Sequence, residues 1–218
     1  MRIVIANQKG GVGKTVSAVN LAYAIHSLRH EKKESVLLID GDEENFAASD
    51  WVATGAKNGV TPPFGCVTLK DYDPKKHKAT HLMLDTKGGE GEDALLTLSK
   101  QFDLLIIPSK PEAISLRALI RTIRPLVKAG RTNYRVLLTD VASAPSTSGE
   151  EAKQSLLDAG VPVIGQMIRR ATAVEDASNR GICVRDVKRN SRASLVWMDY
   201  TIVAREIFAQ ILQQEAMK

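Results

Sequence analysis

A run near the start of the chain, Lys9-Gly10-Gly11-Val12-Gly13-Lys14-Thr15, constrains the fold more than any other feature. It follows the apolar segment 2–6 and precedes residues 15–25, whose apolar side chains recur at helical spacing. Strand, glycine turn and helix are the context of the phosphate-binding pattern G-x-x-x-x-G-K-S/T. The pattern's first glycine is replaced here, and a second lysine, Lys9, stands in the loop. The sequence therefore predicts a strand–loop–helix unit that binds a nucleotide.

Each part of this loop has a physical use in binding phosphate groups. Glycines let backbone N–H groups converge on phosphate oxygens, and the helix N-terminus adds a positive potential. Lys14 is expected to reach the β- and γ-phosphates of ATP, and the Thr15 hydroxyl to ligate Mg²⁺. The residues expected to contact ATP are Lys9, Gly10, Gly11, Val12, Gly13, Lys14, Thr15 and Val16.

The longer segment from Asn7 to Thr15 resembles the deviant Walker A box of the ParA/MinD family of ATPases, which position plasmids, chromosome origins and other cargo. The resemblance implies that Lys9 crosses a dimer interface and touches the phosphates bound by the other subunit. Lys9 and Lys14 would then both be catalytic residues that stabilise phosphate charge. Two bound ATP molecules would stabilise a face-to-face homodimer by mass action.

Apolar runs alternate with helical patterns along the whole chain. Strands are expected at 2–6, 35–40, 67–72 (a short edge strand), 81–85, 104–107 (stopped by Pro108), 136–139 and 161–168. Helices are expected at 15–25, 44–54, 112–128 and 195–214, among others. This alternation favours a mostly parallel, twisted α/β sheet with helices on both faces and ligands at the carboxyl ends of the strands. We expect one ParA-type domain over residues 1–218, without an N-terminal helix-turn-helix domain, as in the small ParA subclass.

Composition narrows the class of protein further. The chain has 218 residues, of which 44% are hydrophobic, enough for one substantial core. Cys66 and Cys183 lie far apart, which argues against a disulfide framework and against the related iron–sulfur branches. The chain begins with a strand and has no long apolar stretch, so a cytoplasmic protein is expected. The formal net charge of +5 permits a polyanionic partner.

Carboxylates follow two of the expected strands, where the nucleotide chemistry requires them. Asp40-Gly41-Asp42 resembles the D-x-D segment of the family, which implies that Asp42 orients the attacking water and that Asp40 supports Mg²⁺. Asp85 matches a Walker B carboxylate, which holds Mg²⁺ directly or through water. The expected metal site thus consists of Thr15, Asp40 and Asp85.

The chain departs from the family pattern after both carboxylate strands. Glu43-Glu44 replaces the usual Pro-Gln after Asp42, and Lys87 replaces a proline in Thr86-Lys87-Gly88-Gly89. Gly88 or Gly89 is expected to offer a backbone N–H to the γ-phosphate. The charged replacements leave the hydrolysis rate open, so a nucleotide-dependent scaffold with negligible hydrolysis is one alternative.

Contacts to the base and to DNA are expected from polar residues later in the chain. Asp140 and Arg170 end two strands at places where the loops of relatives flank the adenine. The cluster Arg185, Lys188, Arg189 and Arg192 is favoured for non-specific DNA, which needs charge and no base-reading groups. A second cationic stripe, on helix 112–128, lies opposite the expected apolar side and is assigned to solvent or to the dimer interface. Its members are Arg117, Arg121, Arg124, Lys128 and Arg131.

Taken together, the resemblance implies a partition or positioning ATPase associated with the nucleoid. ATP would assemble the dimer on DNA, and a cargo-linked, ParB-like partner would stimulate hydrolysis and reset it. The segment 208–218 has too little charge for a MinD-like membrane anchor, so no membrane contact is expected. A metabolic ATP-dependent ligase with the same loop is the alternative from a different class. The cargo, whether plasmid, chromosome, carboxysome or chemoreceptor, stays open.

Overall fold

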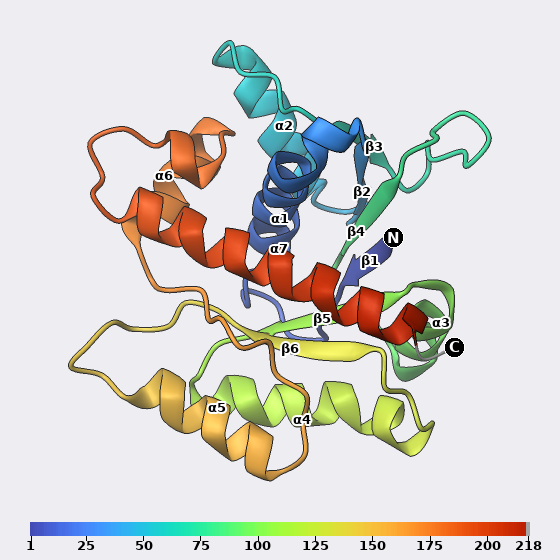
Figure 1. The fold of residues 1–218 in the computed structure, drawn as a ribbon, viewed down its shortest axis with the longest axis vertical. Helices are drawn as coiled ribbons and strands as arrows, with labels where there is room; N and C mark the ends of the chain where they lie inside the picture. The colour runs from blue at the N-terminus through green and yellow to red at the C-terminus, as the bar shows by residue number, and fades with distance from the viewer. Residues whose placement is uncertain (217–218) are drawn as a thin grey trace.

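Six parallel strands form one sheet in the computed structural model, which describes residues 1–216 (Figure 1). The strand order is β3-β2-β4-β1-β5-β6, so β1 lies between β4 and β5. The strands are β1 (Arg2–Ile5), β2 (Val36–Gly41), β3 (Gly65–Thr68), β4 (His81–Thr86), β5 (Leu104–Ser109) and β6 (Tyr134–Leu138). Their sequences are nearly continuous apolar runs because both faces of a parallel sheet are buried.

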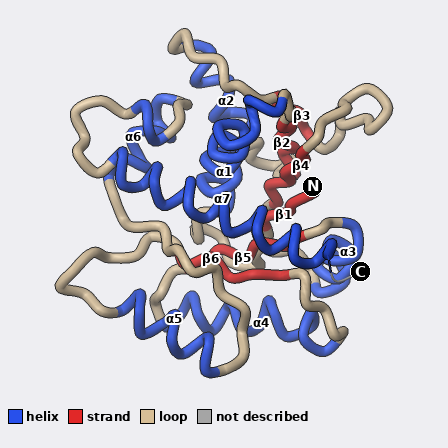
Figure 2. The backbone as a smooth tube through the Cα atoms, in the orientation of Figure 1, coloured by secondary structure: helices blue, strands red, loops and turns tan. Residues whose placement is uncertain are grey.

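Helices cover both faces of this sheet (Figures 1 and 2). On one face lie α1 (Lys14–Arg29), α2 (Ala47–Lys57), α6 (Thr172–Arg180) and α7 (Ala193–Ala216), and on the other α3 (Glu92–Gln101), α4 (Ala113–Lys128) and α5 (Ser148–Asp158). Ile3 and Ile5 of β1 pack into the first layer and Val4 into the second, because successive side chains of a strand point to opposite faces. The predicted fold class is confirmed.

The expected strand over residues 161–168 is wrong. This segment forms an isolated bridge between Val163 and Val136 and no continuous ladder, and the next bridge, Val141 with Arg169, lies one residue beyond it. At its middle, the N–H groups of Gly165 and Gln166 donate to the Glu206 carboxylate of α7, at 2.7 and 2.9 Å. A strand ladder cannot continue where a side chain from another layer takes the backbone donors.

Pro108 does not stop the strand that contains it, contrary to the prediction. β5 continues to Ser109, and on its β6 side Leu105 N–H donates to Asn133 and Thr139 N–H donates to Ser109. Alternate residues of a strand bond to opposite sides, so Pro108 faces the β1 side. There β1 has already ended at Ile5, and no ladder bond needs the missing N–H.

Two other boundaries move for local reasons. The expected helix 44–54 begins only at Ala47, because Phe46 has a left-handed backbone (φ 49°) and its N–H closes a turn onto Asp42. The expected strand 67–72 ends at Thr68, whose hydroxyl binds Asp71 at 2.7 Å and closes a turn. Along α4, the helical spacing predicts one apolar side made of Leu116, Leu119, Ile120, Ile123 and Val127, yet Ile120 and Val127 are 45% and 57% exposed.

The spacing of Val203, Ile207, Ile211 and Leu212 predicts an apolar stripe on the long C-terminal helix α7. The first three of these residues are buried, whereas Leu212 is exposed. No helix among residues 1–216 is long and apolar enough to cross a membrane. The side chains of residues 214–218, which entered the membrane prediction, lie outside the part that the structure describes.

Candidate functional site

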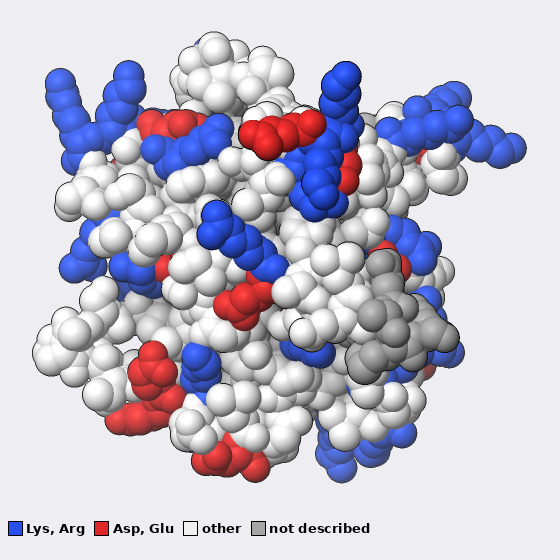
Figure 3. Space-filling model, viewed as in Figure 1, with Lys and Arg blue, Asp and Glu red and all other residues white. Residues whose placement is uncertain are grey.

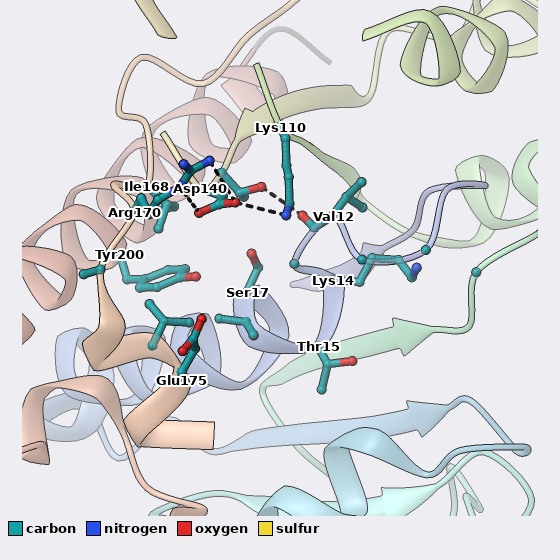
Figure 4. Close-up of a pocket in the computed structure, with 18 of the residues that line it drawn as sticks. Val12, Lys14, Thr15, Ser17, Lys110, Asp140, Ile168, Arg170, Glu175 and Tyr200 are labelled. Carbon is teal, nitrogen blue, oxygen red and sulfur yellow. Dashed lines mark hydrogen bonds and ion pairs between the residues drawn. The ribbon is translucent and has the colours of Figure 1, made fainter. Parts of the chain in front are cut away.

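The glycine-rich loop joins β1 to α1 at the carboxyl end of the sheet and borders a pocket of about 740 Å³ (Figure 4). Gly11 and Gly13 have φ angles of 70° and 84°, in the left-handed region that favours glycine. Residues Gly10 to Ser17 line the pocket, together with Asp42, Thr86, Gly88 and residues that follow β5 and β6. The sheet thus places the predicted loop where ligands of such sheets bind.

Two side chains that the sequence did not single out hold the loop in place. The Thr139 hydroxyl donates to the Val12 carbonyl at 2.9 Å. Buried Asn7 donates to the Pro108 carbonyl at 2.7 Å and accepts the N–H of Lys9 at 2.9 Å. Because both anchors come from strand ends, the backbone of the loop is preorganised before any nucleotide binds.

The two lysines of the loop have different surroundings. Lys14 is buried, and its Nζ donates to the Lys9 carbonyl at 3.3 Å. Burial lowers the pKa of Lys14, and the charges of Asp85, Asp42 and Glu90 oppose this shift. Lys9 is half-buried, and its Nζ donates to the Ser115 hydroxyl of α4 at 2.7 Å. Lys14 therefore borders the pocket, while the Lys9 ammonium is bonded within its own chain.

Asp85, at the end of β4, is fully buried, and neither carboxylate oxygen has a hydrogen-bond partner among the described residues. Burial raises its pKa to about 7, with the nearby Thr15 hydroxyl and Lys14 opposing and the Asp40 charge adding. An unsatisfied buried carboxylate is costly unless it binds a cation or a proton donor. Asp85 beside Thr15 thus fits the oxygen ligands that Mg²⁺ prefers.

Asp40 differs from Asp85 although both are buried strand-end carboxylates. Its Oδ1 accepts the N–H of Asp42 at 3.1 Å, and its Oδ2 accepts the N–H of Ser49 at 2.8 Å. Both oxygens therefore hold the loop that carries Asp42 and the start of α2. No cluster of three or more His, Cys, Asp or Glu side chains suited to a metal occurs among residues 1–216. The direct role of Asp40 toward Mg²⁺ stays a prediction.

Asp42 lines the pocket and is oriented by Asn45, another residue that the sequence did not single out. The Asn45 side-chain amide donates to both Asp42 oxygens, at 3.1 and 3.0 Å, and its backbone N–H donates to Oδ1 at 3.0 Å. Burial alone would raise the pKa of Asp42, but the hydrogen bonds from Asn45 and Glu44 outweigh it and lower the pKa. Asp42 is therefore an ionised carboxylate in a fixed orientation.

The loop after β4 joins the same site. The N–H of Gly89 donates to the Gln8 carbonyl at 2.9 Å, whereas Gly88 lines the pocket. Lys87 reaches Glu44 of the Asp42 loop at 3.1 Å. Lys87 and Glu44, which both depart from the family pattern, thus form an ion pair with each other.

At the far end of the pocket, Asp140 and Arg170 lie together, and Lys110 joins them (Figure 4). Arg170 Nε lies 2.8 Å from Asp140 Oδ1, and Lys110 Nζ lies 3.0 Å from Asp140 Oδ2. Burial opposes ionisation of Asp140, but the hydrogen bonds from Arg170 and Lys110 hold its pKa below the usual value. Ile168, Val174 and Tyr200 add apolar surface beside this group. The combination of a polar cluster and apolar walls suits a heterocyclic base.

The four residues expected to contact DNA lie between α6 and the start of α7, away from the pocket lining. Arg185 is partly engaged, since it pairs with Asp186 at 3.3 Å and stacks on the rings of Tyr23 and Trp197. Lys188, Arg189 and Arg192 are exposed and have no salt-bridge partner within the described part of the chain. Figure 3 shows Lys and Arg side chains projecting at the upper left, where Figure 1 places this segment.

Comparisons with known proteins identify the family of this chain. Residues 3–184 match the family model described as the CobQ/CobB/MinD/ParA nucleotide binding domain. The chain is 31% identical, over 94% of its length and 93% of the relative's, to the maintenance of carboxysome distribution protein A of Gloeobacter kilaueensis.

Two solved structures share the fold. In the MinC:MinD cell division protein complex of Aquifex aeolicus, the matched chain has a TM-score of 0.71 and 20% identity, with 95% of this chain and 96% of that chain covered. The septum site-determining protein MinD of Pyrococcus horikoshii, complexed with Mg-ADP, has a TM-score of 0.65 and 19% identity, with 94% and 95% covered. On the match to the family model and the 31% identity, the chain belongs to the ParA/MinD family of nucleotide-binding ATPases.

Proposed function

We propose that this chain is an ATP-dependent positioning protein. ATP binding assembles a homodimer on non-specific DNA, and a cargo-linked, ParB-like partner stimulates hydrolysis and resets the cycle. The observation that carries the proposal is a phosphate loop that contains two lysines, Lys9 and Lys14, with Lys14 near the unsatisfied carboxylate of Asp85. The relative at 31% identity, named for carboxysome distribution, supports a positioning role.

In this proposal each pocket residue has a defined task. Lys14 and the backbone of Gly10 to Val16 bind the phosphates, and Thr15 and Asp85 hold Mg²⁺, which neutralises charge on the β- and γ-phosphates when bound. Asp40 fixes the Asp42 loop, and Asp42 orients the attacking water. Asp140 and Arg170, with Lys110, flank the adenine. Lys9 contributes its charge to the nucleotide of the second subunit.

DNA is the proposed partner that sets the location of the protein in the cell. Lys188, Arg189 and Arg192 contact DNA phosphates, which need only positive charge, and this contact keeps the cytoplasmic protein on the nucleoid. One ParA-type domain over residues 1–218 carries all of these functions. Carboxysome, plasmid, chromosome or chemoreceptor cargo would be distinguished by the partner protein.

One experiment separates this function from its alternatives: the ATPase rate with and without DNA, measured alongside ATP-dependent DNA retention. DNA retention that requires ATP, with turnover that responds to DNA, is the expected result. Turnover without DNA binding favours a metabolic ligase, and nucleotide-dependent dimers without turnover favour a scaffold. Retention on anionic vesicles in place of DNA would favour a MinD-like protein.

The DNA surface has its own test. Changing Arg189 and Arg192 together to Glu should abolish ATP-dependent DNA retention in an electrophoretic shift while leaving ATP binding intact. Arg117→Glu with Arg121→Glu, on exposed positions of α4, is the matched control because it makes the same change in net charge. If the first double variant retains DNA and the control still dimerises with ATP but does not retain DNA, the DNA surface lies on α4.

A further inference from the structure

Charged side chains from separate segments meet at the far end of the pocket, apart from Lys14 (Figure 4). Lys110 follows β5, Asp140 follows β6, and Arg170 precedes α6. Lys110 Nζ and Arg170 Nε lie 3.0 and 2.8 Å from the Asp140 carboxylate. The backbone supports this arrangement, since the N–H of Arg170 donates to the Val141 carbonyl at 2.7 Å, next to Asp140. Lys110, Asp140 and Arg170 therefore form one fixed cluster, the base-end group.

Asp140 is an ionised carboxylate that retains capacity for further hydrogen bonds. Burial opposes its ionisation, but the hydrogen bonds from Arg170 and Lys110 hold the pKa of Asp140 below its usual value. An ionised carboxylate accepts about four hydrogen bonds and donates none. Among residues 1–216, Oδ1 accepts one bond, from Arg170 Nε, and the Arg170 Nη2 contact to Oδ2 is long, at 3.3 Å. Because Asp140 lines the pocket, both oxygens can accept donors from a bound ligand.

The Lys110 ammonium supplies the complementary function. It has several N–H donors, and Asp140 is its only salt-bridge partner within the described part of the chain. Lys110 also lines the pocket, so its remaining donors can reach an acceptor on the same ligand. The base-end group thus presents a carboxylate that can only accept beside an ammonium that can only donate.

The two purine bases use such a group differently. Guanine carries two adjacent donors, its N1–H and 2-amino groups, for the two oxygens of a carboxylate, and its O6 accepts from a cation. Adenine offers only its 6-amino donor, beside the N1 acceptor, and is read best by an amide that both accepts and donates. Asp140 has no donor for that acceptor, so the chemistry at this position matches guanine better than adenine.

We propose that the base-end group makes GTP a nucleotide of this site, bound at least as tightly as ATP, with Asp140 as the residue that selects guanine. This inference rests on the proposed function, in which the pocket binds a nucleoside triphosphate. The phosphate loop makes the same contacts with either nucleotide, so the base end alone distinguishes them. Asp140 accepts the N1–H and 2-amino groups, and Lys110 donates to O6.

The first test is competition between nucleotides. Fluorescent ATP is bound with Mg²⁺ and displaced by unlabelled ATP, GTP, inosine triphosphate or UTP, the last of which reports the phosphate contacts alone. We expect GTP to displace it at least as well as ATP does. Inosine triphosphate lacks the 2-amino group and should bind about tenfold more weakly than GTP. Weaker binding of GTP than of ATP, or equal binding of GTP and inosine triphosphate, overturns the inference.

The second test changes the selecting residue. Asp140→Asn keeps the size of the side chain and should lower GTP affinity by about tenfold, whereas ATP binding is retained because an amide pairs with adenine. Retained ATP binding also shows that the variant is folded. Xanthosine triphosphate carries an oxygen in place of the 2-amino group, so Asp140→Asn should bind it about tenfold more tightly than the unchanged chain does.

Asp158→Asn is the matched control, because Asp158 is an exposed carboxylate of α5 outside the pocket lining. It makes the same chemical change and should leave the ratio of GTP to ATP affinity as it is in the unchanged chain. A ratio that is also unchanged in Asp140→Asn overturns the role of Asp140, as does a variant that fails to gain xanthosine triphosphate.

Failure of the inference and failure of the proposed function give different results. If the unchanged chain binds ATP and retains DNA but binds GTP more weakly, only the preference for guanine is wrong. If it binds both nucleotides as expected and neither supports DNA retention, the proposed function is wrong and the role of Asp140 stands. If it binds neither nucleotide, both are wrong.

Discussion

At the scale of single residues, Asp85 and Asp42 differ in their hydrogen-bond partners and therefore in their pKa values. Asp85 has no hydrogen-bond partner among the described residues, and burial raises its pKa to about 7. Asp42 accepts hydrogen bonds from Asn45 and Glu44, and these bonds keep the pKa of Asp42 below its usual value. An ionised, oriented carboxylate suits a residue that binds a water molecule, whereas a buried, unsatisfied one suits a cation ligand. The roles proposed for Asp42 and Asp85 agree with these surroundings.

Asp42 and Asn45 can be tested at the same scale. Asp42→Ala should reduce turnover by about 100-fold or more and trap the ATP dimer, because the water loses its orienting group. Asn45→Ala should slow turnover by about tenfold with ATP binding unchanged, since the carboxylate stays but its orientation loosens. Single-turnover phosphate release with sedimentation measures both effects. Asp50→Ala, an exposed carboxylate of α2, is the control; undiminished turnover in Asp42→Ala would refute the assignment.

At the scale of elements, the loops after β2 and β4 are joined by an ion pair beside the pocket. Lys87 Nζ lies 3.1 Å from Glu44 Oε1, and hydrogen bonding to Glu44 raises the pKa of Lys87. Exposed pairs of this kind contribute little to stability, because solvent screens their charges. The Lys87–Glu44 pair instead couples the loop that carries Asp42 to the loop that follows Asp85.

A charge exchange tests this coupling. Lys87→Glu should weaken ATP binding by about threefold to tenfold, because it adds negative charge near Asp42 and Glu90 and repels Glu44. The exchanged variant, Lys87→Glu with Glu44→Lys, should recover most of the lost affinity in equilibrium titrations with fluorescent ATP. Lys100→Glu, an exposed lysine on α3, controls for net charge. Equal affinities for the single and the exchanged variant would show that the two loops are not coupled through this pair.

At the scale of the whole molecule, α7 runs across one face of the sheet (Figure 1) and holds the segment 165–169, next to the end of the pocket formed by Asp140 and Arg170. Asp199, fully buried on α7, accepts hydrogen bonds from Gln166 and from the backbone and guanidinium of Arg169, between 2.6 and 3.1 Å. Glu206, two turns later, takes the N–H groups of Gly165 and Gln166. The C-terminal helix therefore shapes a pocket whose phosphate loop lies at the N-terminal end of the chain.

Asp199→Ala should destabilise the fold by about 3–5 kcal/mol, because it leaves a half-buried guanidinium and a backbone N–H without their partner. Thermal unfolding should show a lower midpoint that rises again when saturating ATP is added. Asp176→Ala, near the surface of α6, should have a much smaller effect. A midpoint unchanged in Asp199→Ala would show that α7 does not secure the base end through this contact.

The sequence by itself determined the parts that depend on local pattern. Continuous apolar strands, helical spacing and the glycine-rich loop were enough to predict a parallel α/β fold and to place Lys14, Thr15, Asp42 and Asp85 at one edge of the sheet. The predictions made from these features are correct because strand periodicity and loop geometry involve residues that are close in the chain.

Only the tertiary structure decided what depends on contacts between distant segments. Thr139 is 127 residues from Val12, and Ser115 is 106 from Lys9, so neither partnership leaves a trace in local spacing. The segment 161–168 has the apolar pattern of a strand, yet Glu206 takes its donors, and Pro108 lies in a strand because β1 ends beside it. Hydrogen bonds and burial join residues by distance in space, and that distance is fixed only when the layers pack.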